Sequence, residues 1–333
     1  MPDPNKLKLA KEHGRSEILL SVALVPETSR VFVGASDGKV YDIADVLADK
    51  LEPRELTGHQ SYVTGLALAG ETLISGSYDG QLIWWNIASG EKTRSIAAAH
   101  AKWIRKLAIS PSGELLASVG DDMVCRVWNV ASGERLHELR GHDEQTPHHF
   151  PSMLYACAFS PDGTKLATVD RVGTGIVWEV ASGEKLAQVV APALYTWDPT
   201  ARIHSIGGAR SVTFSPDGKL LAIGGMGQVG NIDHLEGKSH LDIFDWQAQR
   251  RTHEFPGDQF KGLTEQMIFA PDGKWLVALG GDNGGWAQIY DMETKKVLKQ
   301  EKAPTHIHAA VADAKLDTIV AAGHGKLMVW TLS

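Results

Sequence analysis

Short runs of apolar and polar residues, broken by turn residues, recur along the whole chain. The clearest copy spans residues 73–85, where two apolar runs flank the Asp79-Gly80 pair. An Asp-Gly pair between apolar runs favours a tight hairpin, because the centre of such a turn needs positive φ. The same pattern returns at residues 116–128 and 166–178, and each copy ends in a tryptophan. The chain is therefore predicted to consist of repeated units of short antiparallel strands.

The spacing of the copies predicts the architecture. Trp85, Trp128 and Trp178 are 43 and 50 residues apart, and a period of about 40–45 residues of strand and turn is typical of β-propellers. The strands predicted for six full units lie at residues 19–25, 30–35, 39–43 and 54–56; 62–69, 72–77, 81–87 and 92–97; 103–109, 115–119, 124–130 and 135–139; 153–159, 165–169, 175–180 and 185–190; 210–214, 220–224, 240–246 and 251–255; 265–269, 275–279, 287–291 and 297–300.

A last unit has only three predicted strands, at residues 306–311, 318–322 and 326–332, whereas residues 6–13 alternate in polarity and have no partner nearby. An open array would leave an exposed sheet edge, so the N-terminal segment is expected to complete the last unit. We therefore predict an all-β fold. It is a seven-bladed β-propeller of four-stranded antiparallel blades, closed by a strand at about residues 6–13, with residues 1–333 in one domain.

Several short motifs carry a family resemblance. Gly58-His59 and Gly141-His142 precede predicted first strands, Ser160-Pro-Asp-Gly and its copies form the first turns, and Trp-Asn pairs end the third strands. With these motifs the chain resembles the WD-repeat (WD40) family of β-propellers over nearly all residues from 6 to 333. The pattern departs from the family at Trp85-Asn86, Trp128-Asn129 and Trp178-Glu179, because no unit has Trp-Asp itself.

The resemblance implies a buried network of His, Ser or Thr, Asp and Trp in each regular unit. Carried over by position, the second unit supplies His59, Ser75, Asp79 and Trp85, and the third supplies His100, Ser118, Asp122 and Trp128. The fourth unit has Val172 at the Asp position, so its network is expected to be incomplete. His, Ser and Asp together could suggest a hydrolase, but a nucleophile must be exposed beside an oxyanion pocket, whereas these groups satisfy one another. We predict no catalytic residues.

Composition narrows the function classes. The 333-residue chain has a formal net charge of −7, which argues against a general nucleic-acid or anionic-membrane binder. No segment is apolar enough for a signal peptide or a membrane span. Cys125 and Cys157 are expected to be buried free thiols in a reducing cytoplasm. The Gly224–Gly230 segment has no helix pattern after it, so we interpret it as an insertion rather than a phosphate-binding loop.

Long insertions are expected on one face, where the loops between units and between second and third strands emerge. They span residues 143–152, 191–208, 226–239 and 281–285, all in units four to six, while turns on the other face are short and uniform. Long loops in a compact domain are usually functional or disordered, and Tyr, Trp and Arg are common interface anchors. The residues predicted to contact a protein or peptide partner are Tyr62, Trp103, Phe150, Tyr195, Trp197, Arg202 and His204.

The leading hypothesis is a non-enzymatic scaffold without a cofactor that binds an unidentified protein or peptide and does not bind nucleic acid or insert into membranes. One alternative is a propeller enzyme or a metal- or small-molecule-binding protein on the same face, since imidazole and carboxylate suit transition metals. Its candidate ligands are His148, His149, His204, His234 and His240, with Asp143, Asp198 and Asp233 near them in the sequence. Another alternative is a structural subunit of a larger complex.

Overall fold

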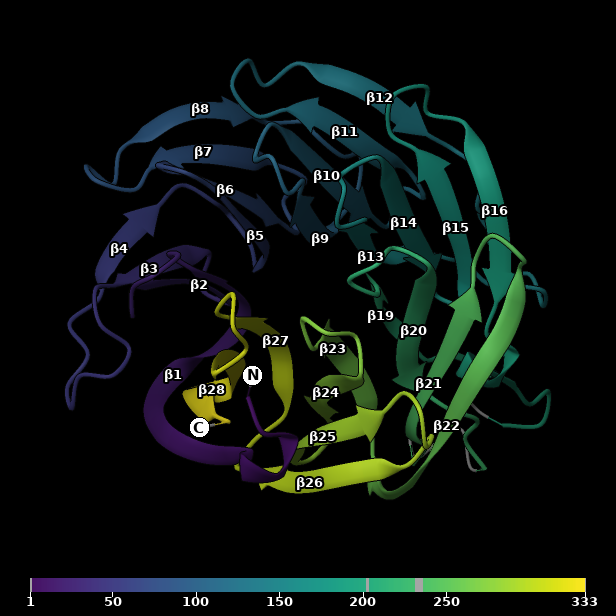
Figure 1. Cartoon of the computed structure of the whole chain (residues 1–333). Helices are drawn as coiled ribbons and strands as arrows, with labels where there is room; N and C mark the ends of the chain where they lie inside the picture. The colour runs from purple at the N-terminus through teal and green to yellow at the C-terminus, as the bar shows by residue number, and fades with distance from the viewer. Residues whose placement is uncertain (1, 202–203, 231–235, 333) are drawn as a thin grey trace.

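Antiparallel sheets stand side by side around a common centre in the computed structural model, which describes residues 2–201, 204–230 and 236–332 (Figure 1). Five of these sheets have four strands each, in sequence order from the centre outward. Their strands are β5 (Val63–Ala69), β6 (Thr72–Ser77), β7 (Leu82–Asn86) and β8 (Lys92–Ile96); β9 (Ile104–Ile109), β10 (Leu115–Gly120), β11 (Cys125–Asn129) and β12 (Arg135–Leu139); β13 (Leu154–Phe159), β14 (Lys165–Asp170), β15 (Thr174–Glu179) and β16 (Lys185–Val190); β19 (Ala209–Phe214), β20 (Leu220–Met226), β21 (Lys238–Asp245) and β22 (Arg250–Lys261); β23 (Leu263–Phe269), β24 (Trp275–Gly281), β25 (Gly285–Asp291) and β26 (Val297–Ala303).

The sixth sheet combines the two ends of the chain, which lie close together in Figure 1. Its six strands, in spatial order, are β27 (Ile307–Ala312), β28 (Thr318–Thr331), β1 (Lys8–Leu24), β2 (Val31–Ala35), β3 (Lys39–Ile43) and β4 (Arg54–Thr57). The first part of β1 pairs with the end of β28, from Lys8 opposite Thr331 to Gly14 opposite Lys326. The remainder of β1 pairs with β2, from Leu19 to Leu24.

The prediction of seven four-stranded blades is wrong. Counting each hydrogen-bonded sheet of four or more strands as a blade, the described residues form six blades, one of them six-stranded. The reason lies in β1, which runs for 17 residues through the point where a break between two units was expected. Gly14 does not adopt positive φ there, and the pairing only shifts register between Gly14 and Ile18. Without a turn the N-terminal strand and the first strand of the first unit are one element.

Apolar side chains fill the space between neighbouring sheets. Val177 on β15, for example, lies in one buried cluster with Leu221 on β20 and Phe244 on β21. Trp84, Trp286 and Trp330 are the largest fully buried side chains. This packing fixes each sheet against the next, so the loops at the end of each strand are held at defined positions.

The described parts of the 191–208 insertion, residues 191–201 and 204–208, contain secondary structure of their own. It contains a three-residue 3-10 turn, η2 (Pro192–Leu194), and a short hairpin of β17 (Tyr195–Trp197) and β18 (Ser205–Gly207). A second 3-10 turn, η1 (Pro4–Lys6), precedes β1. Among the described residues, no helix is long and apolar enough to cross a membrane.

Candidate interaction face

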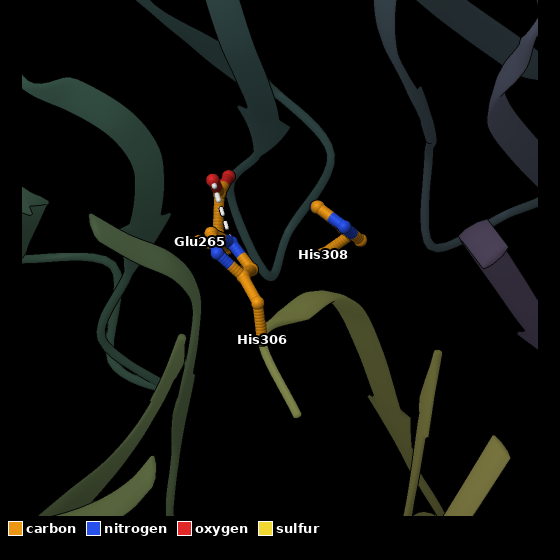
Figure 2. Close-up of side chains that lie close together, drawn as sticks. All are labelled: Glu265, His306 and His308. Carbon is orange, nitrogen blue, oxygen red and sulfur yellow. Dashed lines mark ion pairs between the residues drawn. The ribbon is translucent and has the colours of Figure 1, made fainter. Parts of the chain in front are cut away.

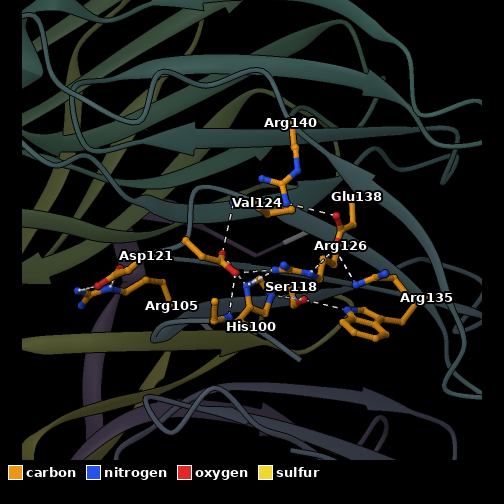
Figure 3. A network of polar contacts seen from close by, with 12 residues as sticks. His100, Arg105, Ser118, Asp121, Val124, Arg126, Arg135, Glu138 and Arg140 are labelled. Atoms are coloured by element: carbon orange, nitrogen blue, oxygen red, sulfur yellow. Dashed lines mark hydrogen bonds and ion pairs between the residues drawn. The ribbon is translucent and has the colours of Figure 1, made fainter. Parts of the chain in front are cut away.

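A hydrogen-bonded network fixes the loop that enters the β9–β12 sheet (Figure 3). His100 lies between Asp122 and Ser118, with Nδ1 2.9 Å from Asp122 Oδ1 and Nε2 2.8 Å from Ser118 Oγ. Trp128 Nε1–H donates to Ser118 Oγ at 2.9 Å, and Asp122 accepts the backbone N–H of Ala101 at 3.1 Å. Burial lowers the pKa of His100, so near pH 7 the neutral ring can donate at one nitrogen and accept at the other. The network therefore ties the loop at Ala101 to two strands.

The β5–β8 sheet repeats this arrangement. His59 Nδ1 lies 3.1 Å from Asp79 Oδ2, and His59 Nε2 lies 2.7 Å from Ser75 Oγ. Trp85 Nε1–H donates to Ser75 Oγ at 2.8 Å, and Asp79 accepts the backbone N–H of Gln60 at 2.8 Å. Ser75 is fully buried and hydrogen-bonded on both sides. Such a hydroxyl stabilises the sheet and is not presented to a substrate.

The expectation of an incomplete network in the fourth unit is wrong. His142 Nδ1 lies 3.0 Å from Asp170 Oδ2, His142 Nε2 lies 2.8 Å from Thr168 Oγ1, and Trp178 Nε1–H donates to Thr168 at 2.9 Å. Asp170 is two residues after Thr168, whereas the corresponding Asp residues follow their Ser by four. An Asp at the end of β14 therefore replaces the turn Asp, although Val172 occupies its sequence position.

Three aromatic rings form a stack on the loop face, which we call the repeat stack: Tyr62, Tyr78 and Trp103. The ring centroids of Tyr78 and Trp103 are 4.3 Å apart at 6° between planes, and those of Tyr62 and Tyr78 are 5.6 Å apart at 22°. Trp103 is 48% exposed and Tyr62 is 42% exposed. The loops are joined by backbone hydrogen bonds of 3.0 Å from Tyr78 to Tyr62 and from Asp121 to Trp103.

Arg105 on β9 contacts the repeat stack on the side that faces the centre of the propeller. Its guanidinium donates to both carboxylate oxygens of Asp121 at 2.6 and 2.8 Å and to the Tyr78 hydroxyl at 2.6 Å. It also lies 5.1 Å from the centroid of the Trp103 ring. Sequence reasoning missed Tyr78 and Arg105. The only signal in the sequence was that Tyr78 directly precedes the Asp79-Gly80 turn.

A second aromatic group, which we call the insertion cluster, joins two of the long insertions: His148, Phe150, Tyr195, Trp197 and His204. Trp197 stacks on His148 with 4.2 Å between ring centroids and contacts Phe150 and His204 at 5.7 and 6.1 Å. His148 Nδ1 lies 3.1 Å from the Tyr195 hydroxyl. Trp197 remains 37% exposed. Four of the predicted contact residues, Phe150, Tyr195, Trp197 and His204, thus lie in one cluster, where much of their surface is covered by other members of the cluster.

The predicted contact residues therefore fall into these two groups. Tyr62 and Trp103 are joined through Tyr78 in the repeat stack. Arg202, together with the candidate ligands Asp233 and His234, lies outside the described residues.

Carboxylate and imidazole groups do gather at the centre, although not those expected from the sequence (Figure 2). Glu265 on β23, His306 before β27 and His308 on β27 place their ligand-type atoms within 4.8 Å of one another. His306 Nε2 lies 3.4 Å from Glu265 Oε1. Burial opposes charging of His306, but the partnership with Glu265 outweighs it and raises the pKa of His306; burial and the neighbouring His306 lower the pKa of His308 to about 4.

A second group with metal-ligand chemistry includes one of the predicted histidines. His240, Asp242 and Glu254 lie within the same 4.8 Å limit. Arg251 already pairs with Asp242 at 3.1 Å and with Glu254 at 2.9 Å. Because the guanidinium already binds both carboxylates, this group is arranged as an ion-pair network rather than an open cation site.

Comparison with known proteins places these loops in repeats of a known type. Residues 52–86 and 90–129, which carry the repeat stack and its two networks, match the family model described as "WD domain, G-beta repeat". These two segments of the β-propeller are therefore WD repeats. WD-repeat propellers typically serve as protein-interaction scaffolds and are typically not enzymes.

Relatives of this propeller match over part of their length. The chain is 40% identical to a guanine nucleotide-binding protein subunit beta of Nicotiana tabacum over 74 residues, which cover 22% of this chain and 20% of that protein. Its counterpart in Oryza sativa subsp. indica is 36% identical over 74 residues, or 22% of this chain and 19% of that protein. A p21-activated protein kinase-interacting protein 1-like of Gallus gallus is 35% identical over 107 residues, or 32% and 28% of the two chains. The matched region thus spans 19–28% of the length of these relatives.

Proposed function

We propose that this WD-repeat propeller is a non-enzymatic scaffold that binds a protein or peptide across the face carrying the repeat stack and the insertion cluster. The observation that carries the proposal is the repeat stack. Two large aromatic side chains, Trp103 and Tyr62, are exposed by 48% and 42% although both are held in place. Interfaces concentrate their energy in a few aromatic and Arg anchors, and prearranged anchors lose little entropy on binding.

Rigidity distinguishes the repeat stack from surface residues that are exposed by chance. Asp121 clamps Arg105 through two short hydrogen bonds, and Arg105 in turn binds the Tyr78 hydroxyl. A hollow of about 390 Å³ lies beside the stack, between the turn at Tyr78–Gly80 and the loop at His100–Trp103. A ring edge flanked by a hollow can receive a partner side chain.

The insertion cluster extends the proposed surface toward units four to six. Phe150, Trp197 and His204 contact one another across two loops, and His148 stacks on both Trp197 and Tyr195. We therefore expect the cluster to shape the edge of the binding surface. The names of the relatives, a guanine nucleotide-binding protein subunit and a kinase-interacting protein, fit an assembly role. The buried free thiols of Cys125 and Cys157 fit a reducing compartment, and we propose a cytoplasmic location.

A displayed library of random peptides tests the proposal while the partner is still unidentified. Selection on the wild-type protein should enrich a shared sequence pattern, and the enriched peptides should lose binding to Trp103→Ala. Leu186→Ala is the matched control, because Leu186 is 41% exposed on the outer strand β16. Enriched peptides that bind Trp103→Ala as well as wild type, but not Leu186→Ala, would contradict the proposed face.

A further inference from the structure

A polar chamber of about 210 Å³ lies at the centre of the propeller beside the repeat stack. Its lining includes Arg105 and Lys106 on β9, Tyr155 on β13, Arg210 on β19 and Glu265 on β23. Tyr78 of the repeat stack also lines it, so the chamber adjoins the proposed interaction face. Binding sites for drug-sized ligands are usually about 300–1,000 Å³, so this chamber suits one functional group rather than a whole cofactor.

Lys106 is a half-buried cation whose charge the surrounding fold compensates only partly. Its Nζ reaches across the centre and donates to Gln266 Oε1 at 3.0 Å, a neutral acceptor. Among the described residues it forms no ion pair with a carboxylate, although an ammonium has three protons to donate. Burial lowers the pKa of Lys106, and Glu265 only partly opposes this effect. Burying a cation is costly unless an anion accompanies it.

The chamber wall adds a second cation that forms no ion pair with a carboxylate in the described parts of the chain. The Arg210 guanidinium lies 3.9 Å from the centroid of the Tyr155 ring and donates to the carbonyl oxygens of Gly207 and Ala209. Arg105 lies 5.1 Å from the same Tyr155 ring. The Tyr155 ring therefore contacts two guanidinium groups, those of Arg105 and Arg210. The hydrogen bonds from Arg210 to neutral carbonyl oxygens do not neutralise its charge.

The charges of the chamber do not balance. The positive side chains are those of Arg105, Lys106 and Arg210, and two carboxylates face them. Asp121 is bound to Arg105, and Glu265 pairs with His306 at 3.4 Å. For Lys106 and Arg210 there remains only the longer-range electrostatic attraction of Glu265. The surplus is positive, and it disfavours a divalent cation at Glu265, His306 and His308.

We propose that the chamber binds a carboxylate, namely that of an aspartate or glutamate side chain in a peptide lying over the repeat stack. Arg105 connects the two sites, because its guanidinium contacts Tyr78 of the stack and Tyr155 of the chamber. Lys106 and Arg210 supply the charge-assisted hydrogen bonds. This proposal rests on the proposed function in one respect, namely that the carboxylate belongs to a bound peptide. The chamber could bind the carboxylate of a small molecule through the same groups.

NMR of the arginine Nε–Hε groups tests the chamber directly. The probes are sodium acetate, a blocked pentapeptide with one glutamate between glycines, and the same peptide with glutamine, at matched ionic strength. We expect the Arg210 signal to shift saturably with acetate and with the glutamate peptide, but not with the glutamine peptide. Saturation with acetate alone would keep the carboxylate site while placing its source in a small molecule.

Two variants and a control separate the chamber from general charge effects. Lys106→Gln should raise the dissociation constant of the glutamate peptide at least tenfold without lowering Tm, because it removes a half-buried and poorly compensated charge. Arg210→Gln should weaken binding similarly and serves if the first variant does not fold. Lys92→Gln, on the exposed outer strand β8, should leave binding unchanged. No saturable shift with either carboxylate probe, or wild-type affinity for the glutamate peptide in both chamber variants, would overturn the proposal. The peptide selection with Trp103→Ala tests the interaction face separately.

Discussion

The repeat stack and the insertion cluster are both aromatic, both half exposed and both on the same face, yet they are held in different ways. Trp103 sits on a loop tied down by Asp121, Asp122 and the His100 network, so its exposed ring is not needed to hold the loop. Trp197 stacks on His148 and touches Phe150 and His204, so much of its surface keeps two insertions together. Exposure alone therefore does not identify an anchor. What matters is whether the ring's contacts are already used.

The largest effect on binding is expected from Trp103→Ala, which removes an exposed ring of the repeat stack. We expect it to weaken peptide or partner binding by about 2 kcal/mol or more, because a central aromatic anchor is removed. Tm should stay close to that of the wild type, since the loop retains its polar ties. Calorimetric titration with a selected peptide, and thermal unfolding of the same sample, provide the measurement. If the variant bound with wild-type affinity, Trp103 would not be an anchor of the interaction.

Asp122→Ala tests whether the polar network holds the repeat-stack loop. It should reduce the free energy of unfolding by about 1–3 kcal/mol, because the buried His100 loses its partner. Binding measured well below Tm should be retained. Denaturant titration of the variant gives the stability, and peptide titration at low temperature gives the affinity. Lost affinity with unchanged stability would mean that Asp122 contacts the partner itself.

Acid should weaken the network at His59 more than the insertion that carries Trp197. Burial alone would raise the pKa of Asp79, but hydrogen bonds from His59 and from the backbone of Gln60 and Gln81 lower it to about 2 from 3.8. Because the folded pKa is below the unfolded one, this stabilisation is present above about pH 4 and is lost as pH falls toward 2. Urea unfolding across this range should show a weaker pH dependence in Asp79→Asn.

The matched carboxylate in the insertion is Asp198, which is partly exposed. Hydrogen bonds from Thr200 lower the pKa of Asp198 as well, but solvent screens its interactions. Asp198→Asn should therefore change the pH dependence of unfolding less than Asp79→Asn. An equal or larger change would show that the insertion, not the His59 network, controls acid stability.

The smallest expected effect on global stability is that of Trp197→Ala. We expect faster proteolysis within the two insertions, because His148, Phe150 and His204 lose the ring that they pack against. The free energy of global unfolding should change less than in Asp122→Ala, and peptide affinity less than in Trp103→Ala. Limited proteolysis with mass spectrometry locates the cuts. A loss of affinity as large as that of Trp103→Ala, with intact loops, would restore Trp197 as the main anchor.

Strand positions could be predicted largely from the sequence because Gly and Asp at the turns separate them. The number of sheets could not, since nothing in the Gly14–Glu17 stretch shows whether the chain turns or continues as β1. The network partner of His142 was missed because Asp170 lies outside the expected spacing. Tyr78 and Arg105 were missed because their roles depend on contacts between neighbouring sheets, which periodicity does not encode.

Hydrogen exchange of the propeller with and without a selected peptide tests the proposed interaction face most directly. If the peptide binds this face, it should protect amides in the loops at residues 61–63, 78–80 and 101–105, around the repeat stack. Protection at residues 195–201 should be weaker. Protection confined to the turns of the opposite face, such as 110–113 and 160–163, would contradict binding at this face.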